Sequence, residues 1–499
     1  MIGDRIPAAL FAAAILASGS GLDYRTRLAI ISRMSSYSCE SVEQAHEALR
    51  EITRGMSVPL RRVCPASRLR AAAIAAEEWA ENKIFVLTRH DLAAAEAYTA
   101  DLPEALFAFG DRSLIQTRAA AILNSRKPRR TTPHDDWITA TRNLVQGALR
   151  EKFTIVSSYG TIPFSMVSHL AFGMPLIVVC HEELPFMNSA QAEKFRSRYG
   201  DLFQWDKTLF ISPFPPATRL PPKVRAVERD NMVGALSSAL LVAEVRPGGI
   251  MDNIVRTAEK KGRKVIRYAG SPETRFAMRT NRQVVIGRSS PCPQPFPLYD
   301  EFATKKSRLV HYTRACPGPW PGQTVADYCR TLEEGCTGSS HSGYHTLRRI
   351  LEERVLRGCA RLTRRAHPVV CFTECGPEEV SRLMAWRRGL IRWSFEPYGI
   401  AFPTKDLFES GVRPVIYAVE EAFQDLSEDL QHLFQPDCSG RTGWAAEKEW
   451  RIRGDLVLTE SLRKDMVVLV PSSDEAEAIA REFGCNVALL AHHMGKGWR

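Results

Sequence analysis

Small polar residues, glycines and an arginine follow short apolar runs at three places in the first half of the chain. At the end of a buried strand such residues can cradle a phosphate, because backbone amides and the dipole of the next helix attract an anion and a guanidinium can close over it. Alone, the turn that begins at Asn124 fits a helix cap with a surface arginine equally well. Together they predict a nucleotide site at one edge of a parallel sheet. The residues expected to contact its ligand are Asn124, Ser125, Arg126, Ser157, Ser158, Gly160, Gly248 and Gly249.

The second half of the chain carries a histidine, an aromatic residue and two carboxylates in expected strands. His311 lies within the first expected strand and Tyr398 opens a middle one, and Glu447 and Glu449 are expected on one face of a late strand. Histidine can bond to a ribose, an aromatic ring can stack on nicotinamide, and a carboxylate can stabilise an oxocarbenium ion. These residue types suit ADP-ribosyl transfer from NAD.

Structural alternatives stand beside that interpretation. His311 has apolar neighbours and also fits a core histidine. The two carboxylates also fit a solvated strand edge, and Glu449 also fits a structural ion pair with Arg451 or Arg453.

The expected elements place these residues on an α/β fold. Residues 1 to about 95 show helical periodicity in 42–53 and 67–82, whereas 84–87 fit a strand or a helix end. From residue 104, strands alternate with helices, which predicts a doubly wound, mostly parallel sheet of Rossmann-like type. Its expected strands are 119–123, 153–156, 176–180, 208–211, 240–245 and 264–268.

After residue 309 the pattern becomes α+β. The expected strands are 308–313, 368–373, 398–402, 413–418, 449–453 and 466–470, with helices at 345–357, 377–390 and 473–483. Four prolines within residues 284–304 predict a linker. We therefore expect a helical region over 1–95, a nucleotide-binding domain over 96–283, the linker over 284–304 and an α+β domain over 305–499.

The order of the first-half segments resembles the DprA/Smf family, within the SLOG superfamily of Rossmann-like nucleotide binders. The segments are AAAILNSRKPR, FTIVSSYGTIPFSMVSHLAFGMPLIVV, RDNMVGALSSALLVAEVRPGG and GRKVIRYAG. The family has glycine where Asn124 and Ser158 stand, and an Arg-Asn-Arg element that opens a helix where this chain has Arg229, Asp230 and Asn231. The departures remove a cationic contact to single-stranded DNA. The resemblance therefore implies a retained fold that binds a small nucleotide, with Arg229 at the site, and only weak DNA binding.

The second half resembles the AbiGi-like phage-resistance family and, more remotely, DarT-type ADP-ribosyltransferases. The motifs are His-x-Thr, Cys-Phe-Thr-Glu, Tyr-Gly-Ile-x-Phe and Glu-x-Glu-Trp-Arg. This resemblance implies that Glu449 is the main catalytic residue, assisted by Glu447, with His311 orienting NAD and Tyr398 stacking on it. The two halves together imply a bacterial defence protein that senses a nucleotide and modifies a macromolecular target. The alternative is a DprA-like protein without enzymatic activity that binds single-stranded DNA in DNA processing.

Composition indicates which partners and which cellular compartment to expect. The chain has 499 residues, enough for about three domains, and a net charge of +11, which favours polyanionic partners. Its twelve cysteines contain no CxxC pair, so we expect reduced thiols in the cytoplasm and no metal site. The apolar start of the chain resembles a signal peptide but also suits a buried helix. We expect no membrane partner, and we expect the N-terminal helices to be an accessory or homo-oligomerising element.

Overall fold

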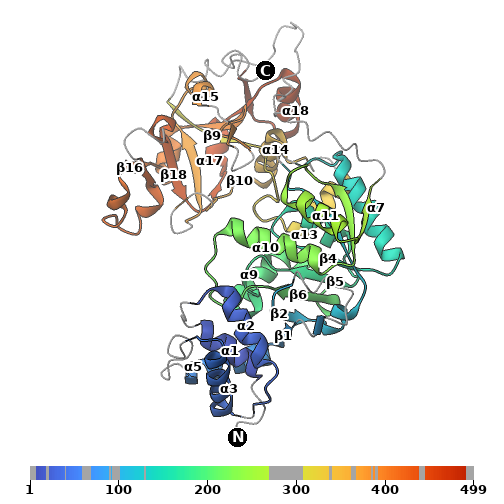
Figure 1. Cartoon of the computed structure of the whole chain (residues 1–499). Helices are drawn as coiled ribbons and strands as arrows, with labels where there is room; N and C mark the ends of the chain where they lie inside the picture. The colour runs from blue at the N-terminus through green and yellow to red at the C-terminus, as the bar shows by residue number, and fades with distance from the viewer. Residues whose placement is uncertain are drawn as a thin grey trace. The chain divides into compact units, whose positions relative to one another are not determined.

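A computed structural model gives the fold of the chain (Figure 1). It describes residues 7–17, 22–39, 41–58, 69–88, 91–92, 102–127, 131–268, 307–335, 340–360, 363, 367–383, 386–387, 392–437 and 444–490. The chain forms two compact units. Unit 1 comprises Met1–Lys127, Pro133–Phe276 and Thr324–Gly335, and unit 2 comprises the remaining segments. The predicted linker over 284–304 lies outside the described residues.

Unit 1 is built on an eight-stranded sheet with the order β1-β2-β6-β5-β4-β3-β7-β8. From β6 to β8 neighbouring strands are parallel, whereas β2 is antiparallel to both β1 and β6. The strands are β1 (Ile84–Thr88), β2 (Ala105–Gly110), β3 (Ala119–Asn124), β4 (Thr154–Ser158), β5 (Leu176–Val179), β6 (Thr208–Ser212), β7 (Ala239–Glu244) and β8 (Lys264–Arg267). The predicted mostly parallel sheet is confirmed, and the ambiguous run 84–87 belongs to a strand.

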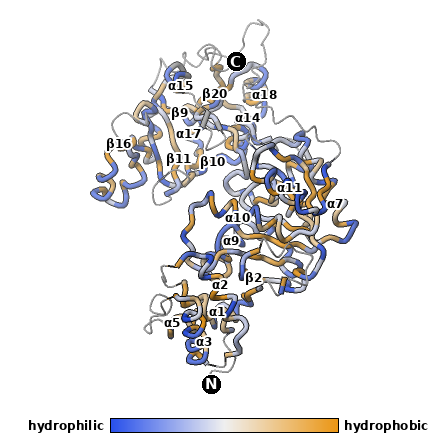
Figure 2. Tube along the Cα trace, in the orientation of Figure 1, coloured by the Kyte–Doolittle hydropathy of each residue, from blue (hydrophilic) through white to orange (hydrophobic). Residues whose placement is uncertain are grey.

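Helices cover both faces of this sheet, because its strands are apolar on both sides. Along β3, Ala120 and Ile122 enter one core, and Ala121 and Leu123 enter the other. The first core is covered by α7 (Asp136–Arg150), α8 (Ile162–Leu170) and α9 (Ser189–Tyr199), and the second by α10 (Pro222–Ala235) and α11 (Ile250–Lys260). Figure 2 shows both hydrophobic and hydrophilic residues along α7, as expected of a helix with one buried side. The doubly wound architecture is confirmed.

The N-terminal segment is helical and packs onto the first of these cores. Residues Ala8 to Leu16 are all buried, as expected of the buried-helix alternative. No helix in the described part of the chain is long and apolar enough to cross a membrane. The helices are α1 (Ala8–Ala17), α2 (Tyr24–Met34), α3 (Val42–Gly55) and α5 (Leu69–Glu81).

A helix from the second half of the sequence completes the core of unit 1. This helix, α13 (Val325–Glu334), is capped by Thr324 and by Gly335 in the left-handed conformation. The Glu333 carboxylate accepts a bond from Arg142 Nε of α7 at 3.3 Å and lies 2.9 Å from His169 Nε2 of α8. Its apolar side is buried in the core of unit 1 and comprises Val325, Ala326, Tyr328, Cys329 and Leu332.

Unit 2 is an α+β unit around a seven-stranded sheet with the order β15-β18-β11-β9-β14-β20-β21. The strands are β9 (Arg308–Thr313), β11 (Val369–Thr373), β14 (Tyr398–Pro403), β15 (Arg413–Pro414), β18 (Glu449–Arg453), β20 (Val467–Val470) and β21 (Asn486–Leu489). The helices are α14 (Gly343–Glu353), α15 (Pro377–Leu383), α16 (Thr404–Glu409), α17 (Glu460–Asp465) and α18 (Ser473–Phe483). The helix expected over 377–390 ends at Leu383, because Trp386–Arg387 and Arg392–Trp393 pair as a small hairpin.

Candidate functional site

Two of the three predicted turns lie side by side at the carboxyl edge of the sheet in unit 1. They follow the neighbouring parallel strands β3 and β7. The backbone amide of Ser125 donates to the carbonyl of Glu244 at 2.9 Å, and the Ser125 hydroxyl accepts from the amide of Arg246 at 2.8 Å. These bonds fix the two turns to each other, as a shared ligand site requires.

The turn after β3 presents its arginine to solvent and keeps its other polar groups inside. Asn124 and Ser125 are buried, and Asn124 Nδ2 donates to the Thr141 hydroxyl of α7 at 2.9 Å. Lys127 is also buried and forms an ion pair with Glu244 at 3.1 Å. Arg126 is exposed. The amide that replaces a family glycine therefore faces the protein interior, and Arg126 is the side chain available to a ligand.

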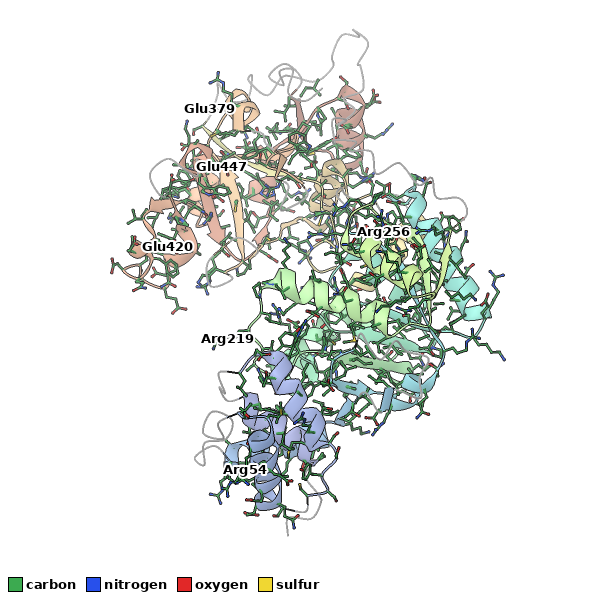
Figure 3. All side chains as sticks on the ribbon, viewed as in Figure 1. Arg54, Arg219, Arg256, Glu379, Glu420 and Glu447 are labelled. Atoms are coloured by element: carbon green, nitrogen blue, oxygen red, sulfur yellow. The ribbon has the colours of Figure 1, made fainter. Side chains whose placement is uncertain are left out.

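The turn after β7 leads into a helix N-terminus that has no side-chain cap. Gly248 has φ +70°, in the left-handed region that favours glycine, and Gly249 is the N-cap of α11. The exposed Arg246 folds back over Gly249, where an added Cβ would lie 3.5 Å from the arginine Nε. Asp252 accepts from the Gly248 amide at 2.9 Å and pairs with Arg256, which Figure 3 labels. Arg246 lies over this helix N-terminus and Arg126 lies in the neighbouring turn, an arrangement that can hold an anion.

The third predicted turn, after β4, offers less to a ligand than the sequence indicated. Ser157 and Ser158 are fully buried, and their hydroxyls donate to the carbonyls of Phe164 and Val179. Gly160 is exposed with φ +84°, and an added Cβ would lie 3.3 Å from the His181 ring. Gly160 is therefore the residue of this turn that can approach a ligand through its backbone.

The Arg229-Asp230-Asn231 element lies inside a helix and does not open one, so that expectation was wrong. Helix α10 begins at Pro222, because proline fits the first turn of a helix. Arg229 and Asp230 are buried and form an ion pair at 2.8 Å, and Arg229 also donates to the Tyr159 carbonyl. Asp230 therefore compensates the charge of Arg229 within the protein.

A group of arginines around His181, beside Gly160, was not predicted from the sequence. His181 follows β5, and the positive charges of Arg229, Arg225 and Arg198 lie close enough to act on it. The Nδ1 atom of His181 and the Nε atom of Arg225 are buried without hydrogen-bond partners among the described residues. Since these residues come from β5, α9 and α10, no local spacing in the sequence reveals them. Arg229 pairs with Asp230 and Arg225 pairs with Glu182 at 3.8 Å, so two of the three arginines around His181 are already paired within the protein.

The acid sensitivity of the fold should report on His181. Burial, and then the charges of Arg229, Arg225 and Arg198, lower the pKa of His181 from 6.5 to about 4. Below pH 6.5 the unfolded chain takes up a proton that the folded chain does not, so stability is lost as the pH falls toward 4. A pKa difference of this size corresponds to about 3 kcal/mol. Urea unfolding at pH 7.5 and pH 4.5 should show a smaller loss for His181→Gln than for the unmodified chain. An equal loss in both would contradict this placement of His181.

In unit 2 the register separates Glu449 from His311. Glu449 pairs with Thr373, and Thr373 pairs with Val310 of β9, so these three side chains share one face of the sheet. His311 follows Val310 and points to the other face, as does its partner Ile400. The sheet therefore does not bring the predicted catalytic carboxylate and the predicted NAD-orienting histidine together.

Glu449 forms the ion pair that was the structural alternative. Arg451 donates to its two carboxylate oxygens at 3.1 Å and 2.8 Å, and Arg451 also donates to the carbonyl of Phe434 and to Gln435. The side chains of Glu449 and Arg451 are only 14% and 6% exposed. The carboxylate is thus held by a fully bonded, buried guanidinium.

Glu447 lies outside strand β18, so the expectation of two carboxylates on one strand face was wrong. It ends a short 3-10 helix, Trp444–Glu447, within unit 2 (Figure 3). Lys448 has φ +41°, which turns the chain before the strand begins at Glu449. The backbone carbonyl of Glu447 accepts a bond from the Thr373 hydroxyl at 2.6 Å.

His311 and Tyr398 share the face opposite Glu449, and both are engaged by the protein. His311 Nδ1 lies 2.8 Å from the Cys371 carbonyl, and burial lowers the pKa of His311 to about 4, so the ring is neutral at pH 7. A neutral ring must carry its proton on Nδ1 to donate this bond. Tyr398 donates to Glu475 at 2.9 Å, and burial raises the pKa of Tyr398. Their predicted roles toward NAD stay predictions.

Known proteins resemble unit 1. The family model for DNA recombination-mediator protein A matches residues 84–289. The X-ray structure of DNA processing protein A (DprA) from Streptococcus pneumoniae is similar with a TM-score of 0.32 and 17% identity, covering 54% of this chain and 87% of that chain. A structure of DNA processing protein A from Helicobacter pylori has a TM-score of 0.27 and 17% identity, covering 37% of this chain and 80% of that chain. No curated protein sequence matches this chain. The matched segment, residues 84–289, is thus DprA/Smf-like in sequence.

Proposed function

We propose that this chain is a DNA-processing protein that binds single-stranded DNA through phosphate contacts at the carboxyl edge of its DprA-like domain. The observation that carries the proposal is the joined pair of turns after β3 and β7. These turns place exposed Arg246 at the N-terminus of α11 and exposed Arg126 in the turn that is bonded to it. The match over residues 84–289 and the net charge of +11 support it. The Helicobacter pylori structure describes single-stranded DNA binding by that relative.

The same geometry predicts weak binding. Asp230 compensates Arg229, and Glu244 compensates Lys127, so two of the cations near this edge are already paired within the protein. Few phosphate contacts give a low affinity with a shallow salt dependence, because each contact on a single strand adds only about 0.7 to the slope of log affinity against log salt. A small phosphorylated nucleotide would use the same arginines, but it would make fewer contacts than a strand.

Replacing Arg126 with alanine should weaken DNA binding with little effect on the fold, since the side chain is exposed. We expect a loss of about 1.5–3 kcal/mol if the guanidinium bonds to a phosphate. Fluorescence anisotropy with a labelled oligothymidine at low salt measures this, with unlabelled duplex DNA and mononucleotides as competitors. Displacement by mononucleotides at micromolar concentration would assign the edge to a small ligand. Unchanged affinity in Arg126→Ala would contradict the proposed contact.

A further inference from the structure

A second surface of unit 1 has the features of a small-molecule site and takes no part in the carboxyl edge. A cavity of about 470 Å³ lies between α9, the residue after α5 and strand β2. Its apolar lining is formed by Phe109, Phe186 and Ala192. Its polar lining comprises Asn82, Ser189, Glu193, Arg196 and Ser197. A cavity of this size, with aromatic rings on one side and several polar side chains around them, can hold a ligand the size of a nucleoside.

The floor of this cavity is a fixed aromatic platform. The rings of Phe109 and Phe186 are stacked with their centroids 4.2 Å apart and an interplanar angle of 27°. Phe186 is buried, and the rings of Phe195, Trp205 and Phe210 meet it edge-on. Phe109 is partly exposed. A ligand ring that stacks on Phe109 therefore meets a surface that needs no rearrangement.

The rim of the cavity carries charges that the protein does not pair. Glu193 and Arg196 are exposed and lie one turn apart on α9, a spacing at which opposite charges commonly interact. Within the described part of the chain, neither forms an ion pair. The Arg196 guanidinium lies 5.3 Å from the centroid of the Trp205 ring, which it covers. Carboxylate, guanidinium and the amide of Asn82 thus surround an aromatic floor with both donors and acceptors.

We propose that this cavity binds a nucleobase, with the base stacked on Phe109 and its polar edge bonded to Glu193, Arg196 and Asn82. Aromatic stacking combined with a few donors and acceptors is the chemistry by which proteins bind unpaired bases. The biological purpose of the site rests on the proposed function, since it gives a protein that binds phosphate at the carboxyl edge a separate contact to a base. Binding of a base in this cavity does not require the residues of the carboxyl edge.

Nucleosides without phosphate test this site separately from the carboxyl edge. Saturation-transfer NMR with the full chain should detect binding of adenosine, guanosine, cytidine or thymidine at millimolar concentration. Arg196→Ala and Glu193→Gln change exposed side chains, and Phe109→Leu removes the ring while keeping an apolar residue. Each should weaken nucleoside binding, with roughly tenfold or greater loss for Phe109→Leu. Arg126→Ala should leave it unchanged.

The outcomes separate this inference from the proposed function. Nucleoside binding that Phe109→Leu abolishes supports the base site even if oligothymidine does not bind. Absence of nucleoside binding, or binding that all three cavity variants leave unchanged, overturns the base site. Oligothymidine binding that is sensitive to Arg126→Ala then leaves the proposed function intact.

Discussion

A fragment that ends at residue 290, after the DprA-like domain, should be much less stable than one that continues to residue 337 and includes α13. The shorter fragment lacks the apolar side of α13, which fills the core of unit 1 against α8 and α9. Complete burial of one large apolar side chain contributes about 1.5–3 kcal/mol to the free energy of unfolding. Three such side chains on α13 therefore contribute nearly as much as the whole stability of an ordinary domain. Urea unfolding followed by circular dichroism compares the two fragments.

A matched pair of substitutions in the full chain checks the same point. Leu332 is fully buried, and Leu332→Ala should cost about 2–5 kcal/mol because it leaves a cavity. Arg330 lies on the same helix with its side chain 54% exposed, and Arg330→Ala should have little effect. Equal unfolding midpoints for the two fragments, or equal effects of the two substitutions, would contradict the role of α13.

Glu449→Gln should destabilise unit 2 by about 3 kcal/mol. The substitution leaves the buried guanidinium of Arg451 without its carboxylate, and breaking one side of a buried ion pair is costly. Replacing both residues, as in Glu449→Gln with Arg451→Met, should restore part of the loss. Thermal unfolding measures both variants, with Glu428→Gln as the control for an exposed carboxylate in the same unit.

This prediction also distinguishes a structural role of Glu449 from a catalytic one. A catalytic glutamate could be replaced by glutamine with the fold intact and ADP-ribosyl transfer lost. A melting temperature that does not change in Glu449→Gln would contradict the structural role. Transfer from labelled NAD that depends on Glu449 would restore the catalytic hypothesis.

Much of the fold could be predicted because parallel strands leave a strong local pattern. Strands buried on both faces are apolar runs bounded by turn residues, as in Leu176–Val179 and Ala239–Glu244. Strand Ala105–Gly110 is also an apolar run but was not predicted, because it pairs antiparallel with both neighbours and is followed by a short 3-10 helix, Arg112–Gln116, so it lacks the strand–α-helix alternation of the parallel part. The start of α10 was predicted near the Arg229-Asp230-Asn231 motif, whereas Pro222 marks where the helix begins.

The candidate site was only partly predictable, since side-chain direction depends on tertiary contacts. The sequence placed Ser125, Arg126 and the glycines after β7 correctly at one edge, but it could not show that Ser157 points into the core. The group around His181 is assembled from three separate elements. Glu449 and His311 lie on opposite faces of the sheet because of the register in which the strands pair, and the sequence alone does not specify that register.

The salt dependence of single-stranded DNA binding tests the central claim most directly. Each phosphate contact on a single strand contributes about 0.7 to the slope of log affinity against log salt. Replacing both Arg126 and Arg246 with alanine should therefore reduce the slope by about 1.4. Arg150→Ala is the matched control, because Arg150 is exposed at the end of α7, which returns to the opposite edge of the sheet. The account predicts a reduced slope in the double variant and an unchanged slope in the control. Equal slopes in all three proteins, or an affinity that does not depend on salt, would contradict it.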